Sequence, residues 1–150
     1  MNNKDMVYMR SAILCAKSSM IINEIPIGAI MVHDDKIIAT STNLSICNID
    51  PTAHAEINVL RIAAKYFNNY RLPDTTLYVT LEPCIMCIGA MIHARIKRLV
   101  FGAFDKKIGA VDNIFKKINP KKINHKIEFI GGILSDECKE LLINFFKNKR

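Results

Sequence analysis

The sequence predicts an α/β fold with three layers, α/β/α, built around a five-stranded mixed sheet in a single domain that spans residues 1–150. Five short stretches rich in β-branched, aromatic and other apolar residues predict the strands. A hairpin at the start, followed by strands that alternate with helices, implies a layered domain with a mixed sheet. The length of 150 residues, half of them hydrophobic, suits one domain with a core of ordinary size.

The first half of the chain contains a helix, a hairpin and a second helix. Residues 5–20 predict a helix because apolar residues recur there at helical spacing: Met6, Met9, Ile13, Ala16 and Met20. Residues 27–33 and 36–42, separated by two aspartates, predict a β-hairpin. The sequence "DPT" at residues 50–52 offers an N-cap and a proline at the first turn of a helix. We therefore expect a helix from there to about Phe67.

The second half alternates strands with helices. The sequences "TLYVTL" at 76–81 and "RLVFG" at 98–102 predict two strands. Between them, Pro83 opens a helix that runs to about His93. After the second of these strands we expect a short helix around residues 112–118.

The chain ends in a strand, "KIEFI" at 126–130, and a helix. Ser135 is the expected N-cap of that helix, which has acidic residues in its first turn and basic residues at its end. The terminal sequence "FFKNKR" at 145–150 leaves two interpretations open. Aromatic residues interleaved with basic ones suit contact with an RNA stem, and they suit equally well a core contact followed by a solvated tail.

The composition places the chain in the cytoplasm. No apolar run approaches the roughly 20 residues that a membrane helix needs. Lys4, Arg10 and Lys17 interrupt the start of the chain, so we find no core of a signal peptide. In a reducing compartment, cysteines act as metal ligands, nucleophiles or small core residues more often than as disulfides. The odd count of 5 cysteines also argues against a disulfide framework.

The basic residues are concentrated near the C-terminus. The formal net charge is +7, and residues 101–150 contribute +5 of it. A basic C-terminal third suggests a polyanionic partner such as RNA. The alternative is a general bias in composition, since Lys, Asn and Ile are abundant throughout, and charge alone leaves both interpretations open.

The sequence "EPCIMC" at 82–87 contains the first half of a candidate metal site, Cys84 and Cys87. A redox pair of the thioredoxin type follows the first strand of a βαβ unit, whereas this pair follows the third predicted strand. A plain buried pair of cysteines is a further alternative. Two thiolates do not complete the four-ligand sphere of zinc, so a metal site requires ligands from elsewhere in the chain.

His54 is the best candidate for a third ligand because it lies in "TAHAE" at the predicted start of a helix, beside Glu56. The H-x-E pattern alone is a weak signal, but about thirty residues upstream of P-C-x-x-C it is a strong one. We expect His33 to be exposed, His93 to lie in the core or at an interface, and His125 to lie in a loop. The other cysteines, Cys15, Cys47 and Cys138, are expected to be small apolar fillers or loop residues.

The spacing predicts two helix N-termini directed at one ion. Side chains tilt toward the N-terminus of a helix, so His54 and Glu56 can both reach a point beyond the first turn. Cys84 and Cys87 share a face at i,i+3, where the partial positive charge of the helix end favours thiolates. Three protein ligands leave a fourth position for water, which is typical of catalytic zinc. Two thiolates cancel the charge of Zn²⁺, so we expect Glu56 to act as a nearby base.

"HAE" together with "PCIMC" resembles the zinc-dependent nucleoside and base deaminases. Within that superfamily the chain is more closely similar to the bacterial tRNA-specific adenosine deaminases. The matching stretches cover most of the chain: "EIPIGAI" (24–30), "DPTAHAEI" (50–57), "YRLPDTTLYVTLEPCIMCIGAMIHARI" (70–96), "VFGAFDKKIGA" (100–110) and "GILSDEC" (132–138). The resemblance implies a cytidine-deaminase-like fold, a homodimer, one Zn²⁺ per subunit, and the anticodon arm of tRNA as substrate.

The resemblance also implies the chemistry. His54, Cys84 and Cys87 would bind the zinc ion and a water molecule. Glu56 would take a proton from that water and pass it to the ring nitrogen of adenine. Attack on the carbon that bears the amino group would then give inosine, with Glu56 protonating the leaving ammonia.

Four further residues would contact the substrate if the resemblance holds. The backbone around Ala55 and Glu82 would lie at the reacting centre. Asn43 would hydrogen-bond the purine, although by itself it would be interpreted as a turn residue after a strand. Asp105 would accept a hydrogen bond from a ribose 2′-hydroxyl, which would favour RNA over DNA.

Two alternatives remain open from the sequence. The first is another zinc-dependent deaminase that acts on guanine, cytosine or a free nucleoside, because the metal motif is common to all of them. The second, from a different class, is a non-catalytic RNA-binding zinc module. In that case replacement of Glu56 would change no measurable activity.

Overall fold

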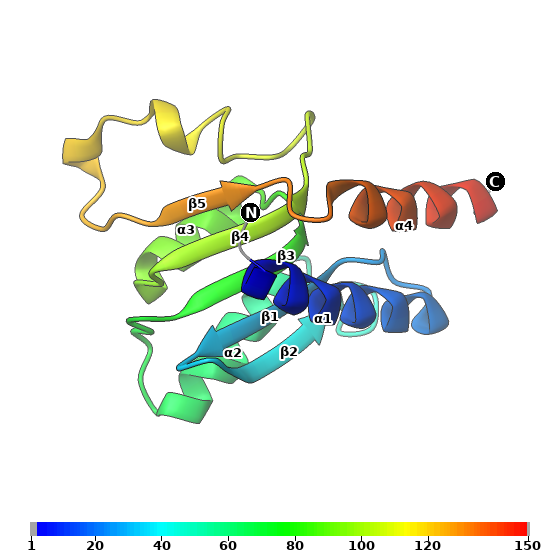
Figure 1. Cartoon of the computed structure of the whole chain (residues 1–150), viewed down its shortest axis with the longest axis horizontal. Helices are drawn as coiled ribbons and strands as arrows, with labels where there is room; N and C mark the ends of the chain where they lie inside the picture. Colours follow the sequence, from blue (N-terminus) through cyan, green and yellow to red (C-terminus); the bar gives the residue numbers. More distant parts are fainter. Residues whose placement is uncertain (1–2, 150) are drawn as a thin grey trace.

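The computed structural model describes residues 3–149 and has the predicted α/β fold, with helices on both faces of a five-stranded sheet of order β2-β1-β3-β4-β5 (Figure 1). The strands are β1 (Gly28–His33), β2 (Lys36–Thr42), β3 (Thr76–Leu81), β4 (Arg98–Ala103) and β5 (Glu128–Gly131). The helices are α1 (Asn3–Ser19), α2 (Ala55–Phe67), α3 (Ile85–Ala94) and α4 (Ser135–Asn148), with short 3-10 turns η1 (Met20–Ile22), η2 (Phe115–Lys117) and η3 (Pro120–Lys122).

The sheet is mixed, as predicted. Strand β1 pairs antiparallel with both β2 and β3, while β3, β4 and β5 run parallel. The carboxyl ends of β2, β3 and β4 therefore lie together at one end of the sheet. Asn43, Glu82 and Phe104 are the residues that follow these three strand ends. Open α/β sheets commonly bind ligands at the carboxyl ends of their strands.

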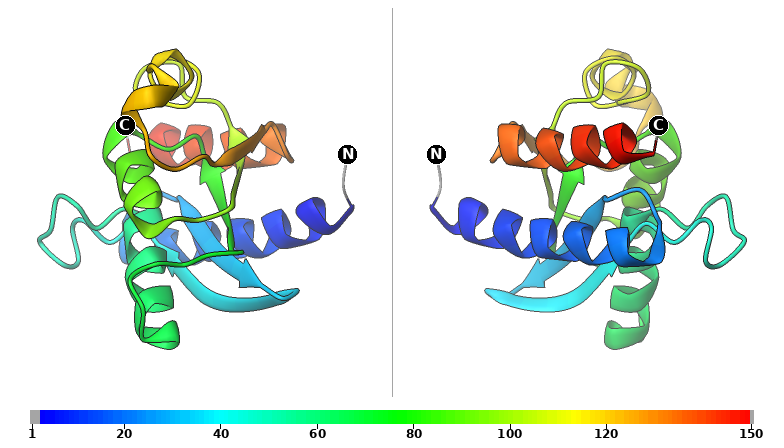
Figure 2. Two further views of the ribbon diagram at one scale, coloured as in Figure 1. Left: turned by 90° about the vertical axis from the view of Figure 1, so that its left-hand side faces the viewer. Right: turned by 90° about the vertical axis from the view of Figure 1, so that its right-hand side faces the viewer.

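Helices α1 and α4 cover one face of the sheet, and α2 and α3 cover the other (Figure 2). Alternate strand residues point to opposite faces, so Ala29 and Met31 pack with α2 and α3 while Ile30 and Val32 pack with α1. The central strand β3 is apolar on both sides because both faces are covered. No helix within residues 3–149 has the length and apolar character needed to cross a membrane.

Two expected helix starts are wrong. Helix α2 begins at Ala55 and not at residues 50–52. The Asp50 carboxylate accepts hydrogen bonds from the Thr52 amide at 2.9 Å and from the Thr52 hydroxyl at 2.7 Å, so it closes a turn ahead of the helix. In α4 the N-cap is Leu134, which has left-handed backbone angles, and Ser135 is the first helical residue. No side chain caps that helix.

The segment between β4 and β5 also differs from the prediction. The short helix expected around residues 112–118 is present only as the 3-10 segment η2 among turns, and η3 follows beyond that range. At the C-terminus, α4 extends past the sheet, and Phe146 is half exposed while the Lys149 ammonium lies 5.3 Å from the Phe145 ring (Figure 1). Arg150, part of the predicted basic end, lies outside the described residues.

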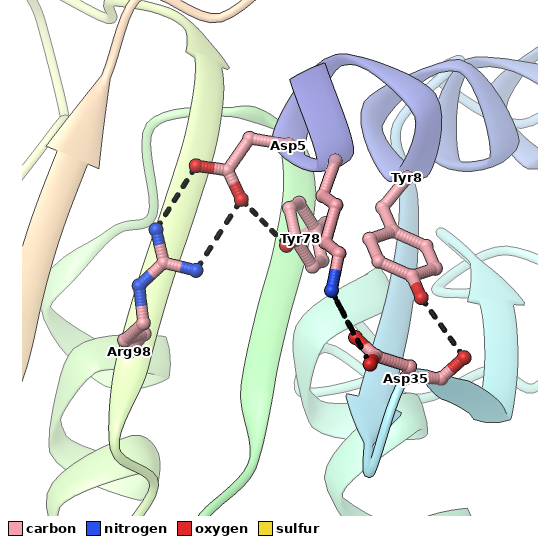
Figure 3. Close-up of polar contacts among 6 residues, drawn as sticks. Asp5, Tyr8, Asp35, Tyr78 and Arg98 are labelled. Carbon is pink, nitrogen blue, oxygen red and sulfur yellow. Dashed lines mark hydrogen bonds and ion pairs between the residues drawn. The ribbon is translucent and has the colours of Figure 1, made fainter. Parts of the chain in front are cut away.

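A buried ion pair holds α1 against the sheet (Figure 3). The Asp5 carboxylate, 2% exposed, lies 3.0 Å from a guanidinium nitrogen of Arg98 and accepts a 2.7 Å hydrogen bond from the Tyr78 hydroxyl. Burial alone would raise the pKa of Asp5, but the hydrogen bonds from Arg98 and Tyr78 outweigh it, so the pKa lies below its ordinary value of 3.8. The pair joins the first helix to the starts of β3 and β4.

We expect Asp5→Asn to lower the free energy of unfolding by about 3 kcal/mol, because it removes the buried counter-charge of Arg98 and leaves only the exposed Glu128 carboxylate, 3.7 Å away. The stabilisation should be present above about pH 4 and be lost as the pH falls through the lowered pKa of folded Asp5. Urea denaturation at several pH values measures both effects.

The matched control is Glu137→Gln, which removes the exposed ion pair between Arg10 and Glu137, 3.1 Å apart. It should cost less than about 1 kcal/mol. Equal losses in the two variants would contradict the assignment of Asp5 as the buried anchor of α1.

Candidate metal centre and active site

Three side chains from two helices converge on one point. The His54 Nδ1 atom lies 3.7 Å from the Cys84 sulfur and 3.5 Å from the Cys87 sulfur, and the two sulfurs are 3.7 Å apart. A tetrahedral ion with Zn–S bonds of about 2.3 Å and a Zn–N bond of about 2.05 Å would hold two sulfurs about 3.8 Å apart and a sulfur and a nitrogen about 3.6 Å apart. The donor atoms therefore fit a tetrahedral zinc ion, with one corner left to a non-protein ligand.

The ligands lie at the first turns of α2 and α3. His54 and Cys84 are the N-cap residues, both with extended backbone angles, and their carbonyls accept the first helical hydrogen bonds from Asn58 at 3.0 Å and Ile88 at 3.1 Å. The partial positive charge at both helix ends favours the negative charge of thiolates.

The two cysteines are electrostatically unequal. The hydrogen bond with the Cys87 thiol, opposed by burial and assisted by His54, lowers the pKa of Cys84 to about 4. The hydrogen bond with Cys84 and burial raise the pKa of Cys87. One proton therefore stays on Cys87, and a bound metal ion would displace it and take both sulfurs as thiolates.

Glu56 is the second residue of α2 and is 5% exposed. Its carboxyl group interacts with the Cys87 thiol and with the charge of His54, so it faces the ligand cluster. Burial raises the pKa of Glu56 above its ordinary value, against the opposing effects of its backbone hydrogen bond and of His54. A carboxyl group with a raised pKa beside a metal site is suited to accepting and returning a proton.

Asn43 and Ala55 lie beside the ligands. Asn43 follows β2, is 7% exposed, and accepts a 3.4 Å hydrogen bond from the Ser45 hydroxyl through its side-chain oxygen. The next amide, that of Leu44, donates to the Ala53 carbonyl at 2.9 Å, which ties this strand end to the residue before His54. Ala55 is fully buried at the first position of α2.

The Glu82 carboxylate, 5% exposed, holds the loop that follows β4, and this loop contacts the backbone just before Cys84. It accepts hydrogen bonds from the amides of Asp105 and Val111, both at 3.1 Å. Its own amide donates to the Ala103 carbonyl at 2.8 Å. Gly109 packs on the carboxylate so closely that a Cβ atom would collide with it. The side chain of Glu82 is therefore engaged within the protein.

Asp105 closes a turn within the same loop. Its Oδ1 atom accepts hydrogen bonds from the amides of Lys107 at 3.0 Å and Ile108 at 3.2 Å. The side chain is partly exposed at the carboxyl end of β4, on the same end of the sheet as the site. This turn orients the carboxylate before any ligand arrives.

Glu24 is a site-supporting residue that the sequence analysis did not identify. It is fully buried, and its carboxylate accepts hydrogen bonds from the amides of Ile46 and Cys47 at 3.0–3.1 Å. Asn58 is a second one, since its side-chain amide donates to the Ala53 carbonyl at 3.2 Å. Neither residue belongs to a spaced motif, so no local pattern in the sequence distinguishes them.

Among the described residues, the only group of three or more possible metal ligands is His54, Cys84 and Cys87. His33 is half-buried, with its ring edge-on to Phe67. His93, which was expected in the core or at an interface, is exposed on the outer side of α3, so a core position is excluded. The Nε2 atom of His125 donates to the Ile96 carbonyl at 2.7 Å. The other cysteines lie apart from this group: Cys15, Cys47 and Cys138.

Comparisons with known proteins agree on one enzyme family. The family model of the MafB19-like deaminases matches residues 2–150. A tRNA-specific adenosine deaminase of Haemophilus influenzae is 50% identical over 147 residues, which is 97% of this chain and 85% of that protein. A protein of the same name from Buchnera aphidicola subsp. Baizongia pistaciae is 51% identical and covers all of this chain and 93% of its own.

A solved structure agrees in its overall fold. It comes from biochemical and structural studies of A-to-I editing by tRNA:A34 deaminases at the wobble position of transfer RNA. It superimposes with a TM-score of 0.86 and 42% sequence identity, covering 90% of this chain and 98% of that one. The cytidine-deaminase-like fold predicted from the sequence is therefore confirmed.

We expect Glu82→Gln to loosen the loop from Asp105 to Val111, because the amide nitrogen of the new side chain would face a backbone N–H. Hydrogen bonds to a charged acceptor contribute about 1.5–3 kcal/mol, so deuterium exchange at the amides of Asp105 and Val111 should become faster. The control is Glu128→Gln on β5, whose side chain is 61% exposed. Unchanged exchange at both amides in Glu82→Gln would contradict the proposed restraint.

Proposed function

The chain belongs to the MafB19-like deaminases and to the tRNA-specific adenosine deaminases, and from this premise we propose that it converts adenosine to inosine at the first anticodon position of tRNA. The reaction is hydrolytic, consumes one water and releases ammonia. The observation that carries the proposal is the set of three metal donors at tetrahedral spacing beside a buried carboxyl group. Similarity over the full chain to proteins named for this activity supports the choice of substrate.

The proposed cofactor is one Zn²⁺ per chain, held by His54, Cys84 and Cys87. Two sulfurs and one nitrogen form a donor set that zinc accepts readily. When bound, the ion supplies Lewis-acid activation of a water molecule at its fourth position. Because two thiolates offset the formal charge of the ion, the protein itself must supply the base.

Glu56 performs the proton transfers in this proposal. Its carboxylate takes a proton from the attacking water and delivers it to the ring nitrogen of adenine. After the oxygen has bonded to the carbon that bears the amino group, Glu56 takes the second proton from that oxygen and gives it to the amino nitrogen. The C–N bond then breaks, ammonia leaves, and the ring keeps a carbonyl group. A carboxyl group with a raised pKa, placed against the metal ligands, suits both acceptance and return of the proton.

Recognition of adenosine is assigned to the strand ends around the metal. Asn43 would hydrogen-bond the purine edge, and its buried position beside the Ala53 backbone supports this role. The backbones of Ala55 and Glu82 would contact the reacting centre. For Glu82 a backbone role agrees with the engagement of its carboxylate by two amides. Asp105 would accept from a ribose 2′-hydroxyl.

The proposed partner is the anticodon arm of tRNA, and the proposed location is the cytoplasm, where tRNA is processed. The net charge of +7 supports binding to a polyanion.

The proposal extends to a homodimer. A cavity of about 450 Å³ lies on the outer side of α2 and α3 and is lined by Leu60, Tyr70, Met86 and Ala90, with His93 at its side. An apolar, partly exposed helix face suits burial against a second copy.

A substrate panel tests the proposed function. We expect the purified protein to release ammonia from an anticodon stem-loop with adenosine at the first anticodon position, and to act at least 100-fold more slowly on free adenosine, guanine and cytosine, because binding to the RNA positions the adenosine. Inosine formation and ammonia release are measured in parallel. Release from guanine alone would replace the proposal with guanine deamination.

We expect Glu56→Ala to reduce turnover by about 10²–10⁴-fold or more while zinc content and RNA binding are retained, because only proton transfer is lost. Metal analysis, RNA binding and single-turnover kinetics measure the three properties. The control Glu140→Ala removes an exposed carboxylate on α4 and should leave turnover unchanged. Wild-type turnover in Glu56→Ala would favour a non-catalytic RNA-binding zinc module, and the lack of zinc in the wild-type protein would overturn the metal assignment.

A further inference from the structure

Most of the excess positive charge lies in one connecting segment. Residues 105–127, which join β4 to β5, contain seven lysines and two aspartates, a net charge of +5 out of +7 for the whole chain. One of the aspartates, Asp112, pairs with Lys116 at 2.9 Å within the segment. The segment extends beyond the β5 edge of the sheet, where Figure 1 shows it in yellow. The net positive charge of the chain is therefore concentrated in this segment, beside the edge strand β5.

The same segment borders a partly open apolar cavity of about 650 Å³. Apolar side chains line its interior: Phe115, Ile118, Pro120, Ile123, Ile127 and Phe129. Polar and basic side chains complete the lining: Lys116, Asn124, His125 and Lys126. No acidic residue lines it. The volume lies in the range of pockets that bind small organic groups.

Hydrogen bonds and ring packing hold the walls of this cavity in place. The rings of Phe115 and Phe129 pack edge to face with centroids 4.8 Å apart. The Arg95 guanidinium donates to the side-chain oxygen of Asn124 at 2.9 Å and to its carbonyl at 3.2 Å. His125 donates to the Ile96 carbonyl at 2.7 Å. The cavity is therefore largely preformed and needs little ordering when a ligand binds.

The segment connects the cavity to the candidate active site. At its start, the amides of Asp105 and Val111 donate to Glu82, and the Ala110 amide donates to the Pro83 carbonyl at 2.9 Å. The cavity lies beside the first residue pairs of β4 and β5, whereas the metal donors lie at the opposite ends of the strands. Phe115 and Phe129 pack in the same core cluster as α2 and α3, so both features lie on one face of the sheet.

The distance between cavity and metal donors indicates the size of the ligand. Six residues of strand β4, at about 3.3 Å per residue, separate the two by roughly 17–20 Å. At about 3.4 Å per stacked nucleotide, and more where the strand is not stacked, this corresponds to at most about five nucleotides along one strand. A free nucleoside cannot span this distance, whereas a folded RNA can.

We propose that this cavity is a second RNA-contact site, which holds an unpaired base of the anticodon loop a few nucleotides away from the reacting adenosine. The flat apolar face of a base would lie against the apolar lining, and the lysines of the segment would neutralise the neighbouring phosphates. An apolar peptide in this cavity would bring no negative charge to pair with the lysines of the segment, whereas RNA would. The inference rests on the proposed RNA substrate and adds a site that determines which RNAs bind well.

The test compares two RNA substrates in two variants. Ile118→Ser changes a cavity wall that is 38% exposed, and Lys126→Glu reverses one charge beside the cavity. One substrate is a complete anticodon stem-loop, and the other is a three-nucleotide RNA centred on adenosine, which is too short to reach the cavity. On the stem-loop we expect KM to rise about fivefold or more with kcat unchanged, and on the short RNA we expect wild-type kinetics. Lys36→Glu, on the opposite edge strand β2, makes the same charge reversal and should leave both substrates unaffected.

Each other outcome has a distinct meaning. Wild-type KM values for the stem-loop in both variants would overturn the second site and leave the proposed function intact. Equal loss on both RNAs would assign the effect to the catalytic centre and also overturn it. A change of oligomeric state by light scattering, with KM unaltered, would identify the cavity as a contact between copies of the chain. Failure of the wild-type protein to deaminate either RNA would instead refute the proposed function.

Discussion

Two helix N-termini that point at one spot are the constraint on which the rest of this structure depends. Helices α2 and α3 begin with His54 and Cys84 in extended backbone conformation, one turn before Cys87 completes the set of donors. Because β3 and β4 pair in parallel, α3 must cross back over the sheet between them, and α2 covers the same face. Both helices therefore begin at the end of the sheet where β3 ends. The site therefore follows from the topology of the sheet as much as from the ligands themselves.

Buried carboxylates restrain two loops near this site by accepting hydrogen bonds from their backbone amides. Glu24 and Glu82 are both buried, and each accepts backbone amides from a loop distant in sequence. Burial of a charge is costly unless hydrogen bonds satisfy it, and backbone amides do so without long flexible side chains. Glu56 differs from both because it faces the donor cluster and not a loop, and its raised pKa leaves it able to exchange a proton.

The distribution of charge links the chemistry to the proposed substrate. The connection between β4 and β5 begins beside the backbone just before Cys84 and then carries most of the excess lysines around an apolar cavity. Within 105–111 it is held by Glu82, and further along it is held by Arg95 and by the Phe115 ring against Phe129. One segment thus joins the backbone beside Cys84 to the surface over which, in our proposal, an RNA would extend.

The sequence by itself predicted the strands and the three candidate metal donors, because those features depend on local composition and on short spacings such as P-C-x-x-C and H-x-E. It could not determine where helices start, since Asp50 can close a turn as readily as cap a helix, and Ser135 lies one residue too late to act as a cap. Tertiary structure alone decided that Glu82 holds residues 105–111, that His93 lies on the surface, and that scattered apolar residues border a partly open cavity. These features join residues far apart in the chain, and no local pattern encodes such contacts.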